Sequence, residues 1–264
     1  MAGKTIVVTS GKGGVGKTTT VANLGTTLAK KKYSVVMIDT DIGLRNLDVV
    51  MGLENRIVYN LVDIIEGKCR KEQAMIRDRK IPNLFMIPAA QTREKNSITP
   101  EQMKELCSTL AADFDYVLID CPAGIEQGFK NAIAGAETAL VVTTPEVSAI
   151  RDADRVIGLL EAAMLKHISL IINRLNAKMV KRGDMMSTED IISLLSVPLL
   201  GVVPESDEVV VSTNRGVPLV HDRSSKAGAA FRRMAARLNG EENLPLDGDG
   251  SQGFLGRVKR LIWD

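Results

Sequence analysis

The eight residues 11–18 constrain this chain more than any other stretch. They read Gly-Lys-Gly-Gly-Val-Gly-Lys-Thr and fit the pattern G-x-x-x-x-G-K-[ST] without a mismatch. The apolar run at residues 5–10 predicts a short buried strand before them, and apolar residues at helical spacing over residues 18–32 predict a helix after them. A strand, a glycine-rich turn and a helix N-terminus together present backbone N–H groups and a positive dipole end to an anion. The segment therefore predicts a phosphate-binding loop.

Each residue type in the loop has a physical reason to be there. Glycines allow the backbone to wrap closely around phosphate oxygens and to adopt positive φ angles. Lys17 is predicted to reach the β- and γ-phosphates as a point charge, and the Thr18 hydroxyl is predicted to ligate Mg²⁺. The predicted nucleotide contacts of this segment are Gly11, Lys12, Gly13, Gly14, Val15, Gly16, Lys17, Thr18 and Thr19.

Lys12 is a second lysine, placed directly after the first glycine of the loop. With it, the segment resembles the deviant Walker A motif of the MinD/ParA family of ATPases. The resemblance implies that Lys12 contacts nucleotide phosphates across a dimer interface, so that the protein is an ATP-dependent homodimer enclosing its nucleotides. Lys12 and Lys17 are accordingly predicted as catalytic lysines. The alternative for Lys12 is a solvated cation of the loop.

Carboxylates follow the second apolar run, residues 34–39. Ligands of open α/β sheets gather at the carboxyl ends of the strands, which is where Asp39 and Asp41 should lie. This segment resembles the first switch region of the same family. The resemblance implies that Asp41 positions the attacking water and that Asp39 supports the Mg²⁺ shell. The alternative for Asp41, and more strongly for Asp48, is a helix N-cap.

The apolar run at residues 116–120 predicts a strand beside the first one, because an apolar strand ending in an aspartate behind a phosphate loop holds Mg²⁺ from the far side. That aspartate is Asp120. Residues 121–126 resemble the second switch of the family, which implies that the backbone N–H of Gly124 senses the γ-phosphate. The predicted metal-binding residues are Thr18, Asp39, Asp41 and Asp120.

The nucleobase is predicted to be adenine. Guanine-selective phosphate-loop proteins use Asn-Lys-x-Asp, whereas this chain has Asn-Arg-Leu-Asn from Asn173 onward and offers no carboxylate to the guanine edge. The Asn173 amide can donate and accept at the adenine edge, with Arg174 beside it. The family resemblance implies that Pro204 and Glu205 help to enclose the base. The alternative for Asn173 is an ordinary turn residue.

Further apolar runs, at residues 84–88, 138–143, 169–173 and 199–203, alternate with helical patterns. This alternation predicts an α/β fold of the P-loop NTPase kind, with a mostly parallel, twisted sheet and helices on both faces. Residues 59–76 also have a helical pattern. The ATPase domain is assigned to residues 1–238, and 264 residues with 45% hydrophobic content are enough for one large domain.

The C-terminal segment differs from the rest. Residues 239–253 are rich in Gly, Asp, Glu and Asn and predict a flexible linker, followed at residues 254–264 by an amphipathic helix. A short helix with an apolar face, cations and a Trp is typical of an interfacial membrane anchor, and this one resembles the membrane-targeting sequence of the MinD septum-site ATPases. The alternative is a helix docked on the protein's own core or on a partner. The predicted membrane contacts are Phe254, Leu255, Arg257, Val258, Lys259, Arg260, Leu261, Ile262 and Trp263.

Together these features predict a slow, partner-stimulated ATP hydrolase that uses ATP and Mg²⁺, dimerises on ATP and binds anionic inner-membrane lipid reversibly from the cytoplasm. The resemblance implies that it positions the cell-division site, and that its partners are a MinC-like division inhibitor and a MinE-like activator or an equivalent factor. A net charge of +2 does not by itself imply a nucleic-acid partner, and none is expected.

The main alternatives are a ParA-like DNA-partitioning ATPase and a flagellar-number regulator. The first would need a basic surface, for which Lys178, Lys181 and Arg182 are the available cluster. An iron–sulfur reductase is disfavoured, because Cys107 and Cys121 do not have the positions of ligands that bridge a cluster at a dimer axis.

Overall fold

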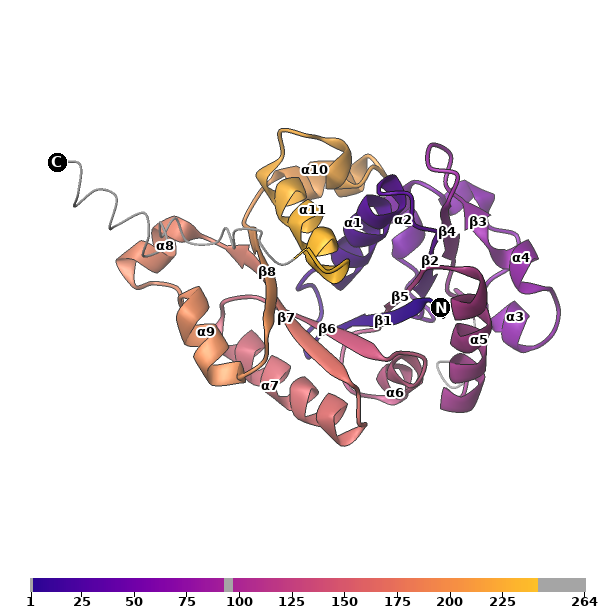
Figure 1. Ribbon diagram of the computed structural model, residues 1–264, viewed down its shortest axis with the longest axis horizontal. Coiled ribbons are helices and arrows are strands. Elements are labelled where there is room, and N and C mark those ends of the chain that lie inside the picture. The colour runs from indigo at the N-terminus through magenta and orange to yellow at the C-terminus, as the bar shows by residue number, and fades with distance from the viewer. Residues whose placement is uncertain (1, 93–96, 242–264) are drawn as a thin grey trace.

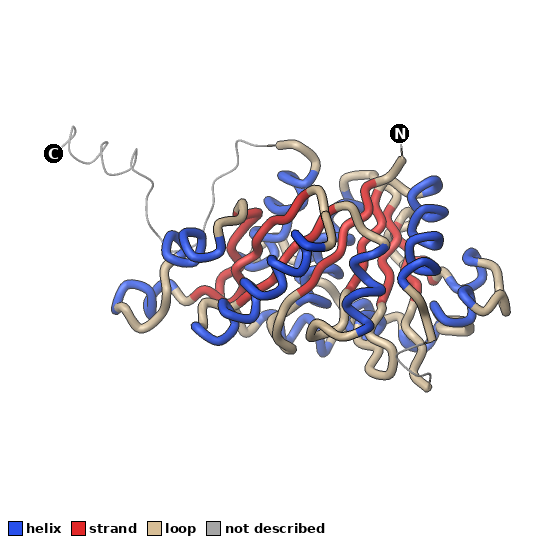
Figure 2. The backbone as a smooth tube through the Cα atoms, turned by 90° about the horizontal axis from the view of Figure 1, so that it is seen from below, coloured by secondary structure: helices blue, strands red, loops and turns tan. Residues whose placement is uncertain are grey.

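The computed structural model describes residues 2–92 and 97–241, and this part of the chain forms one eight-stranded sheet with helices on both faces (Figures 1 and 2). The strand order is β3-β4-β2-β5-β1-β6-β7-β8, parallel except for the antiparallel β3–β4 pair. The predicted fold class is confirmed. The strands are β1 (Lys4–Thr9), β2 (Val35–Asp39), β3 (Ile76–Arg77), β4 (Leu84–Ile87), β5 (Tyr116–Asp120), β6 (Thr138–Thr143), β7 (His167–Leu175) and β8 (Leu199–Pro204).

Helices connect the parallel strands. The α-helices are α1 (Lys17–Lys30), α2 (Leu47–Met51), α3 (Leu61–Ile65), α4 (Lys71–Ala74), α5 (Pro100–Asp113), α6 (Gln127–Ala134), α7 (Val147–Ala162), α8 (Ala177–Arg182), α9 (Thr188–Leu195), α10 (Glu208–Asn214) and α11 (Lys226–Leu238). Two 3₁₀ turns, η1 (Glu54–Arg56) and η2 (Leu219–His221), complete the described part.

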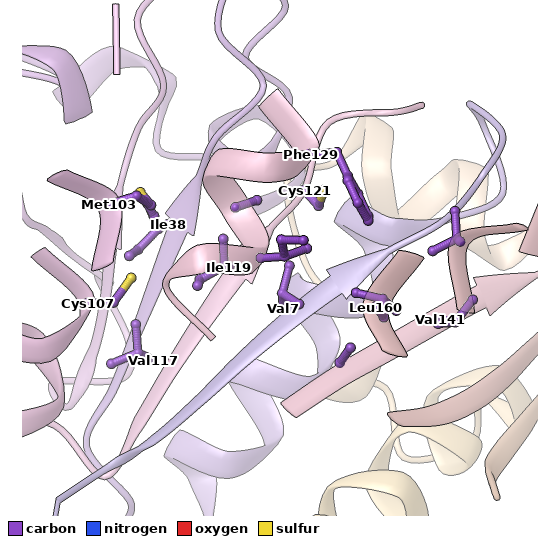
Figure 3. Packing of buried hydrophobic residues seen from close by; sticks show 14 of the residues in the cluster. Val7, Ile38, Met103, Cys107, Val117, Ile119, Cys121, Phe129, Val141 and Leu160 are labelled. Carbon is purple, nitrogen blue, oxygen red and sulfur yellow. The ribbon is translucent and has the colours of Figure 1, made fainter. Parts of the chain in front are cut away.

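The sheet is buried on both faces, which explains why its strands are continuous apolar runs. Successive residues of a strand point to opposite faces, so that Val7 packs in one core while Ile6 and Val8 pack in the other. The first core lies under α5, α6 and α7, and Figure 3 shows Val7 among side chains from several of these elements. The second lies under α1 and α11, where Phe231 is almost fully buried.

Strand β1 lies at the centre of the sheet, with β5 on one side and β6 on the other. The prediction that residues 116–120 form a strand beside the first one is confirmed. The parallel register pairs Val8 with Asp120, and the register between β2 and β5 pairs Asp39 with Asp120. Both aspartates therefore lie at the carboxyl edge of the sheet, directly next to the end of β1.

The helical pattern predicted at residues 59–76 is confirmed in part. The segment forms two short helices, α3 and α4, and then enters strand β3. Gly67 has φ +70, a left-handed conformation that cannot continue a right-handed helix. The start of α5 is capped by Thr99, because its side chain and that of Gln102 form a reciprocal capping box there.

The described body ends just beyond α11. Asn239, Gly240 and Glu241 turn back onto the helix through backbone hydrogen bonds, and the Glu241 carboxylate is 2.5 Å from the Lys31 ammonium. The rest of the predicted linker and the predicted helix at residues 254–264 lie outside the described residues. Among the described residues, no helix combines the length and the apolar content that crossing a bilayer requires.

Candidate nucleotide-binding site

The phosphate loop joins β1 to α1 and depends on glycine at two positions. Gly14 has φ +75 and Gly16 has φ +106, both in the region that side chains rarely adopt. A Cβ atom at Gly16 would also lie 2.3 Å from the side-chain nitrogen of Asn173, which is closer than any atom can tolerate. The loop therefore keeps this shape only with glycine at position 16, and its backbone is packed tightly against the end of β7.

Lys17 is held by the loop itself. Its side chain is buried, and its ammonium donates to the Ser10 hydroxyl at 3.0 Å, while that hydroxyl donates to the carbonyl of Lys12 at 2.7 Å. Ser10 thus connects the two lysines of the motif. A point charge fixed at the start of α1 adds to the positive end of the helix dipole, which favours an anion in the loop.

Two buried carboxylates lie opposite the loop. Asp39 and Asp120 are 1% and 2% exposed, and burial raises the pKa of both. The pKa of Asp39 reaches about 6, although three backbone hydrogen bonds lower it. The pKa of Asp120 is raised well above its usual value by burial and by the charge of Asp39, while a Thr18 hydrogen bond and the Lys17 charge lower it. A cation bound here would relieve this repulsion.

Asp39 performs the capping role that was the alternative for Asp41. Its carboxylate accepts the N–H of Asp41 at 2.9 Å and those of Asn46 and Leu47, the N-cap residue and the first residue of α2, at 3.1 Å. The N-cap alternative for Asp48 is wrong as well. Asp48 is inside α2, is buried, and lies 2.8 Å from the Arg45 side chain as an ion pair.

Asp120 has one carboxylate oxygen, Oδ1, that is buried and has no hydrogen-bond partner in the described structure. Burying a carboxylate oxygen without a partner is unfavourable in free energy unless a cation or a hydrogen-bond donor binds to it. Thr40 ties the two switch segments together here, because its hydroxyl and its N–H both bond to the Asp120 carbonyl, at 2.6 and 3.1 Å. Sequence reasoning missed Thr40, although it lies directly between the two predicted aspartates.

The base-side residues come together at the same edge of the sheet, because Leu175 of β7 pairs with Pro204 of β8. The Asn173 amide donates to the Val15 carbonyl at 2.7 Å, and the Arg174 guanidinium donates to the Gly14 carbonyl at 2.8 Å. Both side chains thus support the phosphate loop. Their predicted contact with adenine, and that of Pro204 and Glu205, stays a prediction.

A hollow of about 420 Å³ lies over the loop. From the predicted set it is lined by Gly13, Gly14, Gly16, Lys17, Thr18, Thr19, Asp41, Asp120 and Arg174. The structure adds residues that the sequence did not suggest: Leu44, Asn46, Val49, Val50, Cys121, Ala123 and Thr213. The remaining predicted nucleotide and metal residues are not among its lining residues: Gly11, Lys12, Val15, Asp39, Gly124, Asn173, Pro204 and Glu205. Gly124 has φ +90 and open space around its Cα, which leaves its predicted contact with the γ-phosphate sterically free.

The two exposed cationic features have different surroundings. Lys12 lies 3.5 Å from the Glu146 carboxylate, and both side chains are about half exposed to solvent. Lys178, Lys181 and Arg182 all lie on the short helix α8, the last two in its final turn, and Arg182 is paired with Asp184 at 2.8 Å. This ion pair reduces the charge on which the DNA-partitioning alternative depended.

The fold and this site define a P-loop nucleotide-binding protein. The sequence matches the family model described as the CobQ/CobB/MinD/ParA nucleotide binding domain over residues 6–219. It is 52% identical over 259 residues to the septum site-determining protein MinD of Synechocystis sp., covering 97% of both chains, and 51% identical over 264 residues to that of Bacillus subtilis, covering 98% of both. The chain therefore belongs to the MinD/ParA family of ATPases, among the MinD septum-site proteins.

Solved structures agree with this assignment. The MinC:MinD cell division protein complex of Aquifex aeolicus matches with a TM-score of 0.87 and 47% identity, covering 92% of this chain and 98% of that one. The septum site-determining protein MinD complexed with Mg-ADP from Pyrococcus horikoshii matches with a TM-score of 0.82 and 30% identity, covering 91% and 99%.

Proposed function

We propose that this chain hydrolyses ATP and uses the bound nucleotide to control its dimerisation and its attachment to a membrane, and so takes part in positioning the cell-division site. One observation carries the catalytic part: Lys17, Thr18 and the partnerless Asp120 oxygen line one hollow at the carboxyl edge of β1 and β5. A fixed ammonium, a hydroxyl and a buried carboxylate are what a magnesium–triphosphate group needs around it.

The residues present fit Mg²⁺. Among the described residues no group of three or more His, Cys, Asp or Glu side chains could hold a metal ion alone. Mg²⁺ is commonly held by one or two carboxylates together with phosphates and waters, and here Thr18 and Asp120 would hold it, with Asp39 behind them. When bound, the ion would neutralise charge that develops on the phosphates. The Mg-ADP complex of the Pyrococcus horikoshii relative supports this choice.

The chain's own groups then have separate tasks. The N–H groups of the loop and the Lys17 ammonium bind the phosphates and stabilise their charge in the transition state. Asp41 lines the hollow and would orient the attacking water, a role that rests on the family resemblance. Adenine is favoured over guanine because residues 173–176 contain no carboxylate.

Dimerisation would depend on Lys12. Its ion pair with Glu146 is exposed, and such pairs contribute at most about 1 kcal/mol. A nucleotide phosphate on a second copy can therefore replace the carboxylate at small cost. Lys12→Gln should bind ATP as a monomer with nearly unchanged affinity, whereas the unmodified chain should elute as a dimer with ATP. A Lys12→Gln protein that still dimerises would contradict this role.

Membrane attachment would use the segment at residues 254–264, which lies outside the described residues. One short amphipathic helix binds a bilayer weakly, with an association constant comparable to the ~10⁴ M⁻¹ of a single acyl chain. Linking two copies makes the second insertion intramolecular and can raise the avidity by ~10²–10⁴. The dimer would thus hold to anionic lipid, and hydrolysis would release monomers.

The proposed partners are a division inhibitor, which the MinC:MinD complex of the Aquifex aeolicus relative supports, and an activating factor similar to MinE. The test is vesicle co-sedimentation of the full chain and of a chain ending before Phe254, each with ATP, ADP and no nucleotide. Only the full chain with ATP should sediment strongly. Equal sedimentation with ADP and ATP would refute the coupling between nucleotide and membrane.

A further inference from the structure

Four cations from three separate segments gather on the α1–α11 side of the protein. They are Lys30 at the end of α1, Lys80 in the turn between β3 and β4, and two arginines of the segment from η2 to α11: Arg223, just after η2, and Arg232, in the middle of α11. We call this set the α1–α11 cationic cluster. Lys30, Lys80 and Arg223 are exposed and Arg232 is partly exposed, so their charges face solvent.

Backbone contacts hold the cluster together. The Lys30 ammonium donates to the Val220 carbonyl at 3.1 Å, and the Arg232 guanidinium donates to the carbonyls of Asp222 and Arg223, at 3.0 and 3.2 Å. The turn that carries Lys80 is tied to the same place, because the nearby Asn83 amide donates to the carbonyls of Ala29 and Tyr33. The three segments are thus fixed side by side by groups other than carboxylates.

The positive charge of the cluster is only partly compensated. Burial and then the charges of Arg232, Arg223 and Lys80 lower the pKa of Lys30, which shows that these cations lie within electrostatic reach of one another. Within residues 2–92 and 97–241, none of the four forms an ion pair with a carboxylate.

Two carboxylates lie nearby but are directed to backbone groups. Asp78 accepts the N–H of Lys80 and the N–H that follows it, at 2.8 and 2.7 Å, and Asp222 accepts the N–H of Ser224 at 2.8 Å. Four cations therefore face two carboxylates that are already hydrogen-bonded. The nearby His221 adds no charge at neutral pH, because burial and the charges of Lys30 and Lys80 lower its pKa.

The cluster lies next to the place where the chain leaves the described body. Lys31, the neighbour of Lys30, pairs with Glu241, and Lys4 at the start of β1 donates to the Leu238 carbonyl at 2.9 Å. Both contacts put the end of α11 at the edge of the sheet where β1 begins (Figure 2). The phosphate loop is at the opposite end of α1, about 20 Å away for a helix of 14 residues.

We infer that the α1–α11 cationic cluster is a second membrane contact, which binds anionic lipid headgroups beside the origin of the C-terminal segment. This inference rests on the proposed membrane attachment and adds a surface of the folded body to it. Attraction to an anionic leaflet falls off within a Debye length of about 8–10 Å. Because the chain leaves the described body beside the cluster, this face is the one that an anchored C-terminal segment would bring toward the leaflet, where the cluster can come within this distance.

The test compares two doubly neutralised full-length proteins. Lys80→Gln/Arg223→Gln removes two charges from the cluster, and Lys178→Gln/Lys181→Gln removes two exposed charges from α8, which follows the carboxyl end of β7 (Figure 1). Within the described part of the chain, none of these four side chains forms a hydrogen bond to the nucleotide site. Binding is measured with ATP and Mg²⁺ on vesicles of mixed anionic and zwitterionic phospholipid, on purely zwitterionic vesicles, and on non-specific duplex DNA.

On mixed vesicles the cluster variant should bind about ten-fold or more weakly, because each cation near an anionic surface is worth about five-fold in affinity. The α8 variant should bind like the unmodified protein, and on zwitterionic vesicles all three should bind alike. Equal binding of both variants on mixed vesicles would overturn this inference and leave ATP-dependent attachment intact. So would a cluster variant that lost affinity for DNA alone. Failure of the unmodified protein to bind with ATP would instead refute the proposed function.

Discussion

Replacing Asp120 by asparagine should stabilise the nucleotide-free protein and at the same time abolish its stabilisation by Mg–ATP. The carboxylate is 2% exposed and lies next to Asp39 across the β2–β5 pair, so ionising both is unfavourable. Asparagine removes one of the two charges and keeps an oxygen that can accept the Thr18 hydrogen bond. The same change removes the anionic oxygen that Mg²⁺ needs.

The size of the effect follows from the pKa of the neighbouring carboxyl. Raising the pKa of Asp39 from 3.8 to about 6 corresponds to roughly 3 kcal/mol of unfavourable ionisation at neutral pH. A buried charge without a partner costs about 3 kcal/mol or more, and from this cost for Asp120 we subtract about 1–2 kcal/mol for leaving the new amide N–H groups without an acceptor. The remaining gain of about 1–2 kcal/mol should raise the Tm by roughly 3–6 °C in a protein of this size.

The gain in stability from Asp120→Asn should grow as the pH rises. A carboxyl whose pKa is raised by folding binds more protons in the folded state than in the unfolded one. Its burial therefore lowers the stability of the protein by nothing below about pH 4 and by more as the pH rises toward the folded-state pKa. Above that pKa the loss of stability is constant. The advantage of Asp120→Asn should accordingly be smallest near pH 4 and larger near pH 8.

Thermal unfolding with a chelator, and again with Mg–ATP, measures both effects. Asp154→Asn on the exposed surface of α7 is the matched control, and its Tm should change by less than that of Asp120→Asn at every pH. The reasoning is refuted if Asp120→Asn is less stable than the unmodified protein at about pH 8 without ligand, or if Mg–ATP stabilises both to the same extent.

Two further predictions concern the loop and the thiols. In Gly16→Ala the added Cβ would lie 2.3 Å from the Asn173 amide nitrogen, at a φ of +106 that alanine rarely adopts. The loop must therefore shift, and the nucleotide affinity should fall by about 100-fold in a fluorescence titration. An unchanged affinity would mean that the loop tolerates a side chain. Burial raises the pKa of both Cys107 and Cys121 to about 12, so a thiol reagent should modify only Cys69 in the native protein and all three thiols in denaturant; a native count above one would contradict this.

The part of the site that could be predicted from sequence is the part encoded by neighbouring residues. The phosphate loop is one continuous segment, and its glycine requirement is visible because the conformation at Gly16 is local. The pairing of β1 with β5 was also predictable, because an apolar run ending in Asp120 has a recognised place next to such a loop. In both cases the residues that identify the feature are neighbours in the sequence.

The rest depended on contacts between distant segments. Thr213 of α10 lines the hollow, yet no local pattern marks it. Asp39 was visible as a carboxylate at a strand end, but whether it faces a metal or caps a helix depends on the three N–H groups that surround it. The helical pattern over residues 59–76 did not reveal its division into two short helices for a related reason, since apolar periodicity continues across a break at a single glycine.

The geometry of α1 limits how nucleotide and membrane can be coupled. Eleven of its 14 residues are buried, with the phosphate loop at one end and Lys30 and Lys31 at the other. So tightly packed a helix does not deform easily along its length, because protein interiors have low compressibility. We therefore expect association of two copies, rather than distortion of α1, to be the coupling step. If so, fusing a dimerising coiled coil before Lys4, at the edge where the described chain ends, should make vesicle binding nearly as strong with ADP as with ATP. A monomeric helix of equal length is the control. A fused dimer that still required ATP would show that nucleotide acts within each copy, on the C-terminal segment itself.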